Sequence, residues 1–451
     1  MNIRQLLILG VLSVGKIFAA AQNENSSVPH IINLQRAVEL ALEHNHAVRI
    51  SSLKVEEDEH AKEVARSAYL PVLRNDTSFS HVTDTQLIEI PAGSLGSVGP
   101  NPIPPRDQII NQGGRNIFIS GTGLTQPLTE LFKIKAENDA ARAEVEASKG
   151  KAASVKDQVA LKVRQLYYNI LIVQSQHQAI EAKIQAFEDL QEERVQQVKY
   201  GSTLQADVIE SQAQTLQSKQ DLLTSELQLS DLRMQFNDVV GLPIRSEIAL
   251  DPDVPVPPAS CSRDVCTKIA FDSNPEIAEA KAEVEKASAG VRAAKREYIP
   301  DVEASVRYSH QNNSVPFLAS DFGTFSVRAG YDIFDGGKKR ATLREREAQL
   351  AQSKENLARI TDEIEVKVQT AYNKLERTKQ MIAVSQELLA ARKEAQRESA
   401  HGLARGTQLR SQAETATAQE SEAQTLLLQS QLEYAQAQDE LNEAMGQGAN
   451  E

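Results

Sequence analysis

Apolar residues recur along two stretches of the chain at alternating steps of four and three residues. Such steps are typical of the seam between two helices of a coiled coil. The first set is Val159, Val163, Leu166, Ile170 and Val173, and the second is Ile364, Val368, Ala371, Leu375, Thr378, Ile382, Ser385 and Leu389. Core positions are often Ala, Ser or Thr, so the helices are expected to pack closely.

The helices that carry these seams are predicted to be very long. No proline interrupts residues 131–199, and the only glycine there is Gly150. At 1.5 Å per residue, such a helix is roughly 100 Å long. A second long helix is expected over residues 338–401. Each is expected to be followed by a return helix, at 205–240 and at 408–445.

Two segments of the second half, 300–311 and 323–334, alternate apolar and polar residues with a period of two, as strands do. The apolar positions are Val302, Ala304, Val306, Tyr308, Phe325, Val327, Ala329, Tyr331 and Ile333. The polar positions are Glu303, Ser305, Arg307, Ser309, Ser326, Arg328, Gly330 and Asp332. Each segment has roughly the ten residues of a tilted membrane-crossing strand. A sheet in a water-soluble protein, with one face exposed to solvent, would give the same alternation.

The first half carries weaker versions of the same strands at 71–85 and 114–128. Their alternating positions are Leu73, Asn75, Thr77 and Phe79, then Phe118, Ser120, Thr122 and Leu124. Between them lies a long loop rich in glycine and proline, which predicts several turns. The matching loop of the second half is short.

Each pair of strands follows a pair of shorter helices. Residues 33–70 are expected to form a short helix and a second one that Pro71 stops. Residues 262–298 are expected to do the same, with Pro300 as the stop.

These matching elements make the two halves copies of one arrangement. A shift of 229 residues carries Asn45 onto Asn274, and a shift of 205 carries Gly241 onto Gly446. The difference of 24 residues falls in the long loop of the first half. This period far exceeds that of a solenoid, so the chain is a duplicated architecture. We expect repeats at 22–241 and 261–446, a Pro-rich linker at 242–260 and a tail at 447–451.

The N-terminal segment 1–21 has the features of an export signal. Arg4 supplies the positive start, Leu6–Phe18 is largely apolar, and Ala19–Ala20–Ala21 is a small-residue cleavage site. A membrane anchor is the weaker alternative, because the apolar run is shorter than the ~20 residues of a spanning helix. The formal net charge of −13 becomes −15 without the signal, which argues against nucleic acid as a partner.

The only cysteines are Cys261 and Cys266. A disulfide between them fits an exported chain, although a loop this short contributes modest stability. A metal site is the alternative, but there is no second cysteine pair or nearby histidine with zinc-binding spacing.

No catalytic constellation is present, so we expect neither an enzyme nor a cofactor. Gly336–Gly337–Lys338 lacks the rest of a phosphate-binding loop. His44 and His46 are interpreted as surface residues at a helix end. An exported coiled-coil scaffold or adhesin would explain the long helices, but not the paired amphipathic strands.

Four strands cannot close a membrane barrel by themselves, and an open sheet edge is not tolerated in lipid. Small barrels need about eight strands or more. Several chains must therefore share one barrel, and three chains would supply twelve strands.

The order helix, strand, loop, strand, long helix, return helix, given twice, resembles the TolC-like outer-membrane efflux proteins over essentially the whole mature chain. The matching segments are Ala68–Tyr69–Leu70–Pro71, Leu124–Thr125–Gln126–Pro127–Leu128, Ile333–Phe334–Asp335–Gly336–Gly337–Lys338 and Leu441–Asn442–Glu443–Ala444–Met445–Gly446. Glu130–Leu131–Phe132–Lys133 departs from the family's usual Gly-Arg, so the resemblance does not extend to that junction.

The resemblance implies a homotrimer with a twelve-stranded barrel in the outer membrane and a long helical tunnel in the periplasm. It implies a periplasmic adaptor and an inner-membrane transporter as partners, and drugs, metals or proteins as cargo carried outward.

By this resemblance, the closed end of the tunnel and its docking surface lie at the helical turns Gly201–Ser202 and Gly406–Thr407. Both glycines are also explained as ordinary helix caps. Family members hold this end shut with ionic latches. The candidate latch here is Asp207 paired with Arg405 or Arg410, within or between subunits.

Overall fold

The computed structural model describes residues 31–84, 87–111, 114–254, 261–312 and 319–449. The expected signal at 1–21 and the end of the expected linker lie outside these residues. Among the helices within them, none is both long and apolar enough to cross a membrane.

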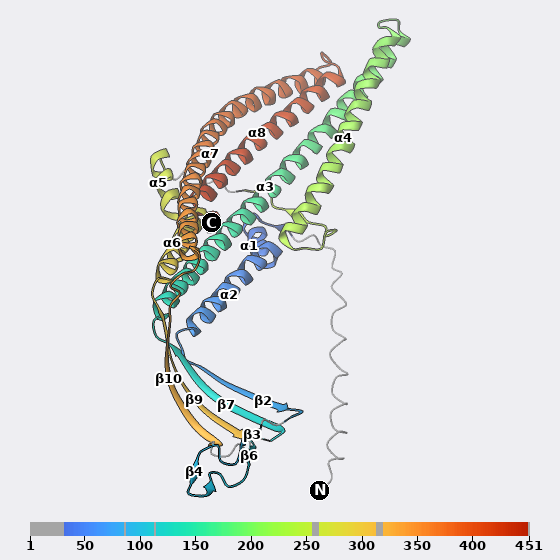
Figure 1. Ribbon diagram of the computed structural model, residues 1–451. Helices are drawn as coiled ribbons and strands as arrows, with labels where there is room; N and C mark the ends of the chain where they lie inside the picture. The colour runs from blue at the N-terminus through green and yellow to red at the C-terminus, as the bar shows by residue number, and fades with distance from the viewer. Residues whose placement is uncertain (1–30, 85–86, 112–113, 255–260, 313–318, 450–451) are drawn as a thin grey trace, which may run out of the picture.

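Four long helices form two antiparallel hairpins (Figure 1). The first hairpin consists of α3 (Leu131–Lys199) and α4 (Gln205–Val240), and the second of α7 (Lys338–Ala404) and α8 (Arg410–Ala444). Helices α3 and α8 pack against each other and join the two hairpins. The predicted seams are their buried faces, because Val163, Ile170, Ile364 and Val368 are fully buried.

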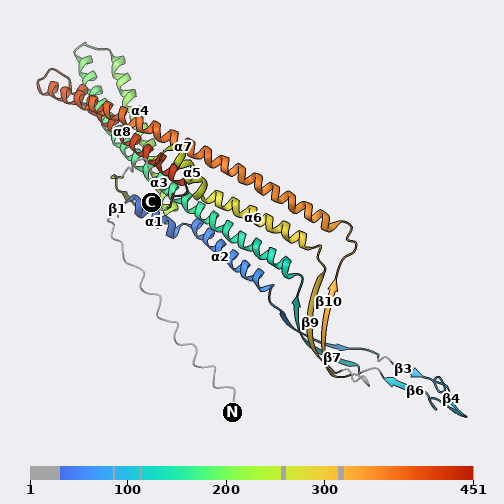
Figure 2. The ribbon, with the colours of Figure 1, turned by 90° about the vertical axis from the view of Figure 1, so that its left-hand side faces the viewer.

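The shorter helices are α1 (Leu34–His44), α2 (His46–Ser67), α5 (Arg263–Ser273) and α6 (Pro275–Arg296). Near the sheet, α2, α3, α6 and α7 lie side by side in that order, as Figure 2 shows.

Two asparagines make the internal repeat visible at the level of single hydrogen bonds. The side-chain oxygens of Asn45 and Asn274 accept from backbone amides at the starts of α2 and α6. Their Nδ2 atoms donate to the carbonyls of Val239, at 2.9 Å, and Ala444, at 3.0 Å. Asn45 and Asn274 are related by the 229-residue shift, and Val239 and Ala444 by the 205-residue shift. Each repeat therefore attaches its short helices to its return helix in the same way.

Four strands form an antiparallel sheet in the order β10-β9-β7-β2. Their bounds are β2 Val72–His81, β7 Asn116–Pro127, β9 Asp301–Asn312 and β10 Asp321–Gly330. The sheet lies at one end of the helices, and its outer strands β10 and β2 have free edges within the chain (Figure 1).

The prediction that the last strand reaches residue 334 is wrong, because β10 ends at Gly330. The alternating pattern continues, but the chain turns there to enter α7. The Asp335 carboxylate accepts from the backbone amides of Gly337 and Lys339, both at 2.8 Å. The Lys339 amide is the main cause that lowers the pKa of this carboxyl. The motif thus forms a helix start rather than a strand end.

The pairing register puts the polar and apolar positions of the sheet on opposite faces. Ser305 lies opposite Ser326, with their hydroxyl oxygens 2.7 Å apart, and Val306 lies opposite Phe325. Leu124 of β7 is paired with Val306, so the apolar face continues into the first-half strands.

Some positions on this face carry polar side chains, which explains why the apolar–polar alternation of the first-half strands was weak in the sequence. The Nδ2 atom of Asn75 donates to the Thr122 hydroxyl at 2.8 Å, and the hydroxyls of Thr77 and Ser120 lie 2.9 Å apart. These cross-strand hydrogen bonds pair the polar groups with one another.

The long turn-rich loop of the first half forms an antiparallel β-hairpin, whose short strands the sequence did not predict. Strand β3 (Leu87–Ile90) pairs with β6 (Gln108–Asn111), and β4 (Ser97–Val98) pairs with β5 (Asn101–Pro102). Its glycines and prolines lie mostly in the turns between the short strands of the hairpin.

The core consists of two buried apolar clusters near the middle of the long helices, one mainly within each repeat. Tyr167 of α3 is fully buried beside Phe236 of α4. Its hydroxyl lies 3.0 Å from the Ile32 carbonyl and 2.8 Å from the Asp251 carbonyl, and burial raises the pKa of Tyr167 to about 12. Ile32 is the second residue of β1 (Ile31–Ile32), which pairs in parallel with β8 (Ala249–Leu250), and Asp251 directly follows β8. The sequence did not predict this two-residue pairing.

A buried polar cluster fixes the start of the tail between α3 and α8. Arg164 donates to the Gly448 carbonyl at 2.9 Å and lies 3.4 Å from Asp439. Asp157 accepts from the Ala449 amide at 2.7 Å, and burial is the main cause that raises the pKa of this carboxyl. The cluster joins the first repeat to the end of the second.

Candidate functional site

The two helical turns at the far end from the sheet have the same geometry. Gly201 and Gly406 have φ angles of +71° and +72°. The amides of Gly201 and Ser202 donate to carbonyls three and five residues earlier at 2.9 and 2.8 Å, and those of Gly406 and Thr407 do so at 2.9 Å. No atom lies within 4 Å of a Cβ built on either glycine. Glycine is favoured there by backbone conformation, since a left-handed cap ends each helix.

Asp207 lies just beyond the first turn and caps its own helix. Its carboxylate accepts from the Leu204 amide at 3.1 Å and from the Thr203 hydroxyl. The Thr203 hydrogen bond is the main cause that lowers the pKa of Asp207. These partners satisfy the start of α4 locally. The expected pairing of Asp207 with Arg410 is therefore not present within one chain, where Arg410 contacts Asp189 instead.

A contact between the two hairpins was missed by sequence reasoning. Arg410 Nε lies 3.0 Å from Asp189 Oδ2, and the Asp189 side chain is only 7% exposed on α3. One turn further along α3, Glu193 accepts from the backbone amide of Ser411 at 2.9 Å and from its hydroxyl. A carboxylate at the first turn of α8 is also favoured by the helix dipole. The start of α8 is thus tied to the end of α3.

We call these four residues, Asp189, Glu193, Arg410 and Ser411, the inter-hairpin latch. The only sequence signal for it is the four-residue spacing of Asp189 and Glu193, which puts both on one face of α3. Their partners follow more than 200 positions later, so the pairing depends on how α3 and α8 pack. Pairing of Asp207 with Arg405 or Arg410 across a subunit boundary stays a prediction.

The polar face of the sheet carries charges of both signs. Arg307 of β9 reaches across β7 to Asp76 of β2, at 3.4 Å, and a Cβ on Gly121 would collide with its guanidinium. Arg328 and Glu303 pair at 3.5 Å on the same face. Charges facing lipid are costly, so this is the face that a membrane barrel would turn inward.

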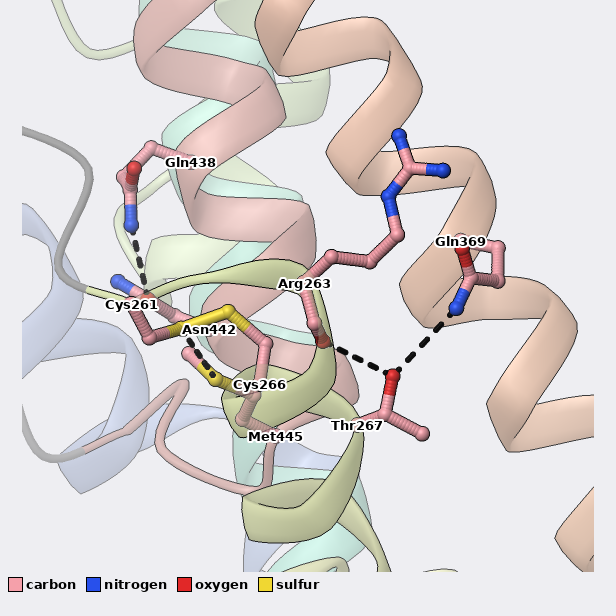
Figure 3. The surroundings of a disulfide bond; sticks show 8 residues. All are labelled: Cys261, Arg263, Cys266, Thr267, Gln369, Gln438, Asn442 and Met445. Carbon is pink, nitrogen blue, oxygen red and sulfur yellow. Dashed lines mark hydrogen bonds between the residues drawn. A yellow bond between two sulfur atoms is a disulfide. The ribbon is translucent and has the colours of Figure 1, made fainter.

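Cys261 and Cys266 are joined by a disulfide at the start of α5 (Figure 3). Their Cα atoms are 5.7 Å apart, and Cys266 is fully buried. The sulfur of Cys261 lies 3.8 Å from that of Met445, at the end of α8. The bridge would hold the start of α5 against the end of the chain's last helix.

We expect no free thiol when the exported protein is denatured and counted with a thiol reagent without reductant. Reductant should release two thiols per chain. Two reactive thiols in unreduced protein purified from the cell envelope would contradict this prediction.

Comparison with known proteins is consistent with this geometry. Solved structures similar to the chain include the Campylobacter jejuni CmeC outer membrane channel, with 13% identity and a TM-score of 0.74 over 95% of this chain and 91% of that one. The open state of the Neisseria gonorrhoeae MtrE outer membrane channel has 17% identity and a TM-score of 0.70, over 92% and 89%. The Vibrio cholerae outer membrane protein VceC has 14% identity and a TM-score of 0.71, over 92% and 96%.

These likenesses show the fold: a trimeric twelve-stranded barrel continued by a helical tunnel, with four strands from each chain. No curated protein sequence matches the chain. The family model for outer membrane efflux proteins matches residues 37–241 and 268–447, one match in each repeat. The chain is therefore a member of the outer membrane efflux protein family.

Proposed function

We propose that three copies of the chain form the outer-membrane channel of a tripartite efflux or type I secretion assembly. An inner-membrane pump and a periplasmic adaptor deliver the substrate, and the channel passes it outward without using energy itself. The observation that carries this proposal is a sheet with one charged and one apolar face that continues directly into the helices α3 and α7, each roughly 100 Å long.

The sheet supports the channel because it is incomplete in one chain. Strands β10 and β2 have free edges, and unpaired backbone groups are not tolerated in lipid. Pairing β2 of one subunit with β10 of the next closes the barrel. The charged face, with Arg307 and Arg328, then lines the water-filled interior.

The helical turns support docking of an adaptor at the other end. Gly201–Ser202 and Gly406–Thr407 lie at the tips of the two hairpins, and each turn is followed by an exposed leucine, Leu204 or Leu409. The two leucines are related by the 205-residue shift, so the trimer presents six similar apolar points. We propose that helical hairpins of the adaptor contact these points.

The inter-hairpin latch is proposed to hold the tunnel end narrow. Arg410 is exposed to solvent, which screens its pair with Asp189, so three copies of the whole latch act together. Replacing Arg410 with alanine and Glu193 with glutamine should raise the single-channel conductance of the trimer in planar bilayers. The matched control is Arg359→Ala, which removes an exposed pair with Glu363 within α7 itself.

The pairing across subunits is tested separately by replacing Asp207, Arg405 and Arg410 together with neutral residues. We expect a higher conductance than Arg410→Ala alone gives. Wild-type conductance of an intact trimer carrying all these changes would place the closure elsewhere.

A further inference from the structure

The hairpin of residues 87–111 exposes an apolar surface that no described residue of the chain covers. The side chains of Leu95, Val98 and Ile109 are 71%, 70% and 62% exposed. Its charged residues are only Glu89, Arg106 and Asp107. Apolar surface of this kind marks a contact site.

The hairpin also lacks the means to be stable alone. Two-stranded hairpins are marginal in water without packing against something else. In Figures 1 and 2 it lies beyond the ends of the barrel strands, on the side away from the helices. It therefore needs a partner located at the outer mouth of the barrel.

The place from which the hairpin emerges identifies that partner. It follows β2, which is an edge strand of the sheet and pairs with the neighbouring subunit when the barrel closes. The hairpin thus begins at a subunit boundary and continues the trimer interface outward. The corresponding connection between β9 and β10 is much shorter, so each subunit contributes one long hairpin.

The hairpin is long enough to reach the threefold axis. Twelve strands about 4.8 Å apart and tilted by about 40° enclose a barrel of about 12 Å radius. The segment from Leu87 to Val98 spans up to about 40 Å if extended. A hairpin leaning inward by a fraction of its length therefore meets its two symmetry mates.

We propose that the three copies of hairpin 87–111 pack against one another through Leu95, Val98 and Ile109, and narrow the outer exit of the channel. Substrate passage then requires their separation. This inference rests on the proposed channel, but the contact between hairpins is measured independently of transport.

The test uses Val98→Cys in the full-length trimer in outer membranes. Oxidation should produce a crosslinked dimer of subunits on a non-reducing gel. Thr77→Cys, on the outward face of β2, is the matched control and should give no dimer. A native gel shows whether the trimer is present. Absence of the trimer would overturn the proposed function, whereas a trimer without the Val98→Cys crosslink would overturn the hairpin contact, as expected if the hairpins bind outer-leaflet lipid instead.

Conductance of the same variant tests the narrowing. Oxidised Val98→Cys trimers in planar bilayers should conduct less than reduced ones, and wild-type trimers given the same treatment should not change. Equal conductance before and after crosslinking would show that the hairpins touch without constricting the exit.

Discussion

An arginine in place of Val306 should prevent most of the protein from assembling in the outer membrane. Val306 lies on the apolar face of the sheet, opposite Phe325 and beside Leu124. A charge facing the middle of the bilayer costs about 2–4 kcal/mol, and the trimer would carry three. Val327→Arg should have a similar effect. The measurement is the yield of folded trimer extracted from outer membranes.

The matched controls are Ser305→Arg and Ser326→Arg, adjacent to these positions in sequence but on the opposite face. Their hydroxyls already face each other on the side that carries Arg307 and Glu303. Polar substitutions are tolerated there because the side chains meet water. Equal trimer yields for all four variants would contradict the assigned faces.

Gly446→Ala should be the most damaging small substitution in the helical part of the molecule. Gly446 has a φ of +74°, and an added Cβ would lie 2.6 Å from the Ser273 carbonyl oxygen and 3.0 Å from the Asn274 Cα. Both are backbone atoms at the α5–α6 junction and cannot move aside as a flexible side chain does. Backbone strain and overpacking together should lower stability by about 2–5 kcal/mol.

Gly406→Ala is the control that separates these causes. Its φ of +72° is nearly the same, but no atom lies within 4 Å of the new Cβ. The strain of placing alanine at this positive φ should by itself lower the free energy of unfolding by about 1–2 kcal/mol. Thermal unfolding of the two trimers measures the difference, and equal shifts in Tm would mean that the close approach at Gly446 is unimportant.

The sequence was sufficient for the fold class and the long helices, because both depend on signals repeated many times along the chain. The seam from Val159 to Val173 repeats a local period, and the structure has that helix at the predicted residues, Leu131–Lys199. The need for several chains followed from strand number and the rule against open edges in lipid, whereas the number three came from the family resemblance. The fold class is confirmed.

Local chemistry that competes with a pattern was harder to predict. The alternation through Ile333 favoured a longer strand, yet β10 ends at Gly330, and Asp335 accepts hydrogen bonds from backbone amides at the start of α7. In β2 and β7 the hydrogen bond between Asn75 and Thr122 replaces apolar contacts, which obscured the strands. The hairpin at 87–111 was hidden because turn residues outnumber its short paired segments.

The predicted ion pair of Asp207 with Arg405 or Arg410 shows why long-range contacts could not be predicted. Asp207 bears the right charge for a pair with arginine, but its nearest donors, Thr203 and the Leu204 amide, are local. Arg410 instead contacts Asp189, whose position depends on the packing of α8 against α3. A single sequence gives the charges of such residues, whereas their pairing follows only from tertiary structure.

The mass of the assembly measures the central claim most directly. Protein extracted from isolated outer membranes and analysed by native mass spectrometry should have the mass of three mature chains. It should retain the β content of its four-stranded sheets. A stable single chain with the same β content would contradict the account, because β2 and β10 would then leave open edges without a partner.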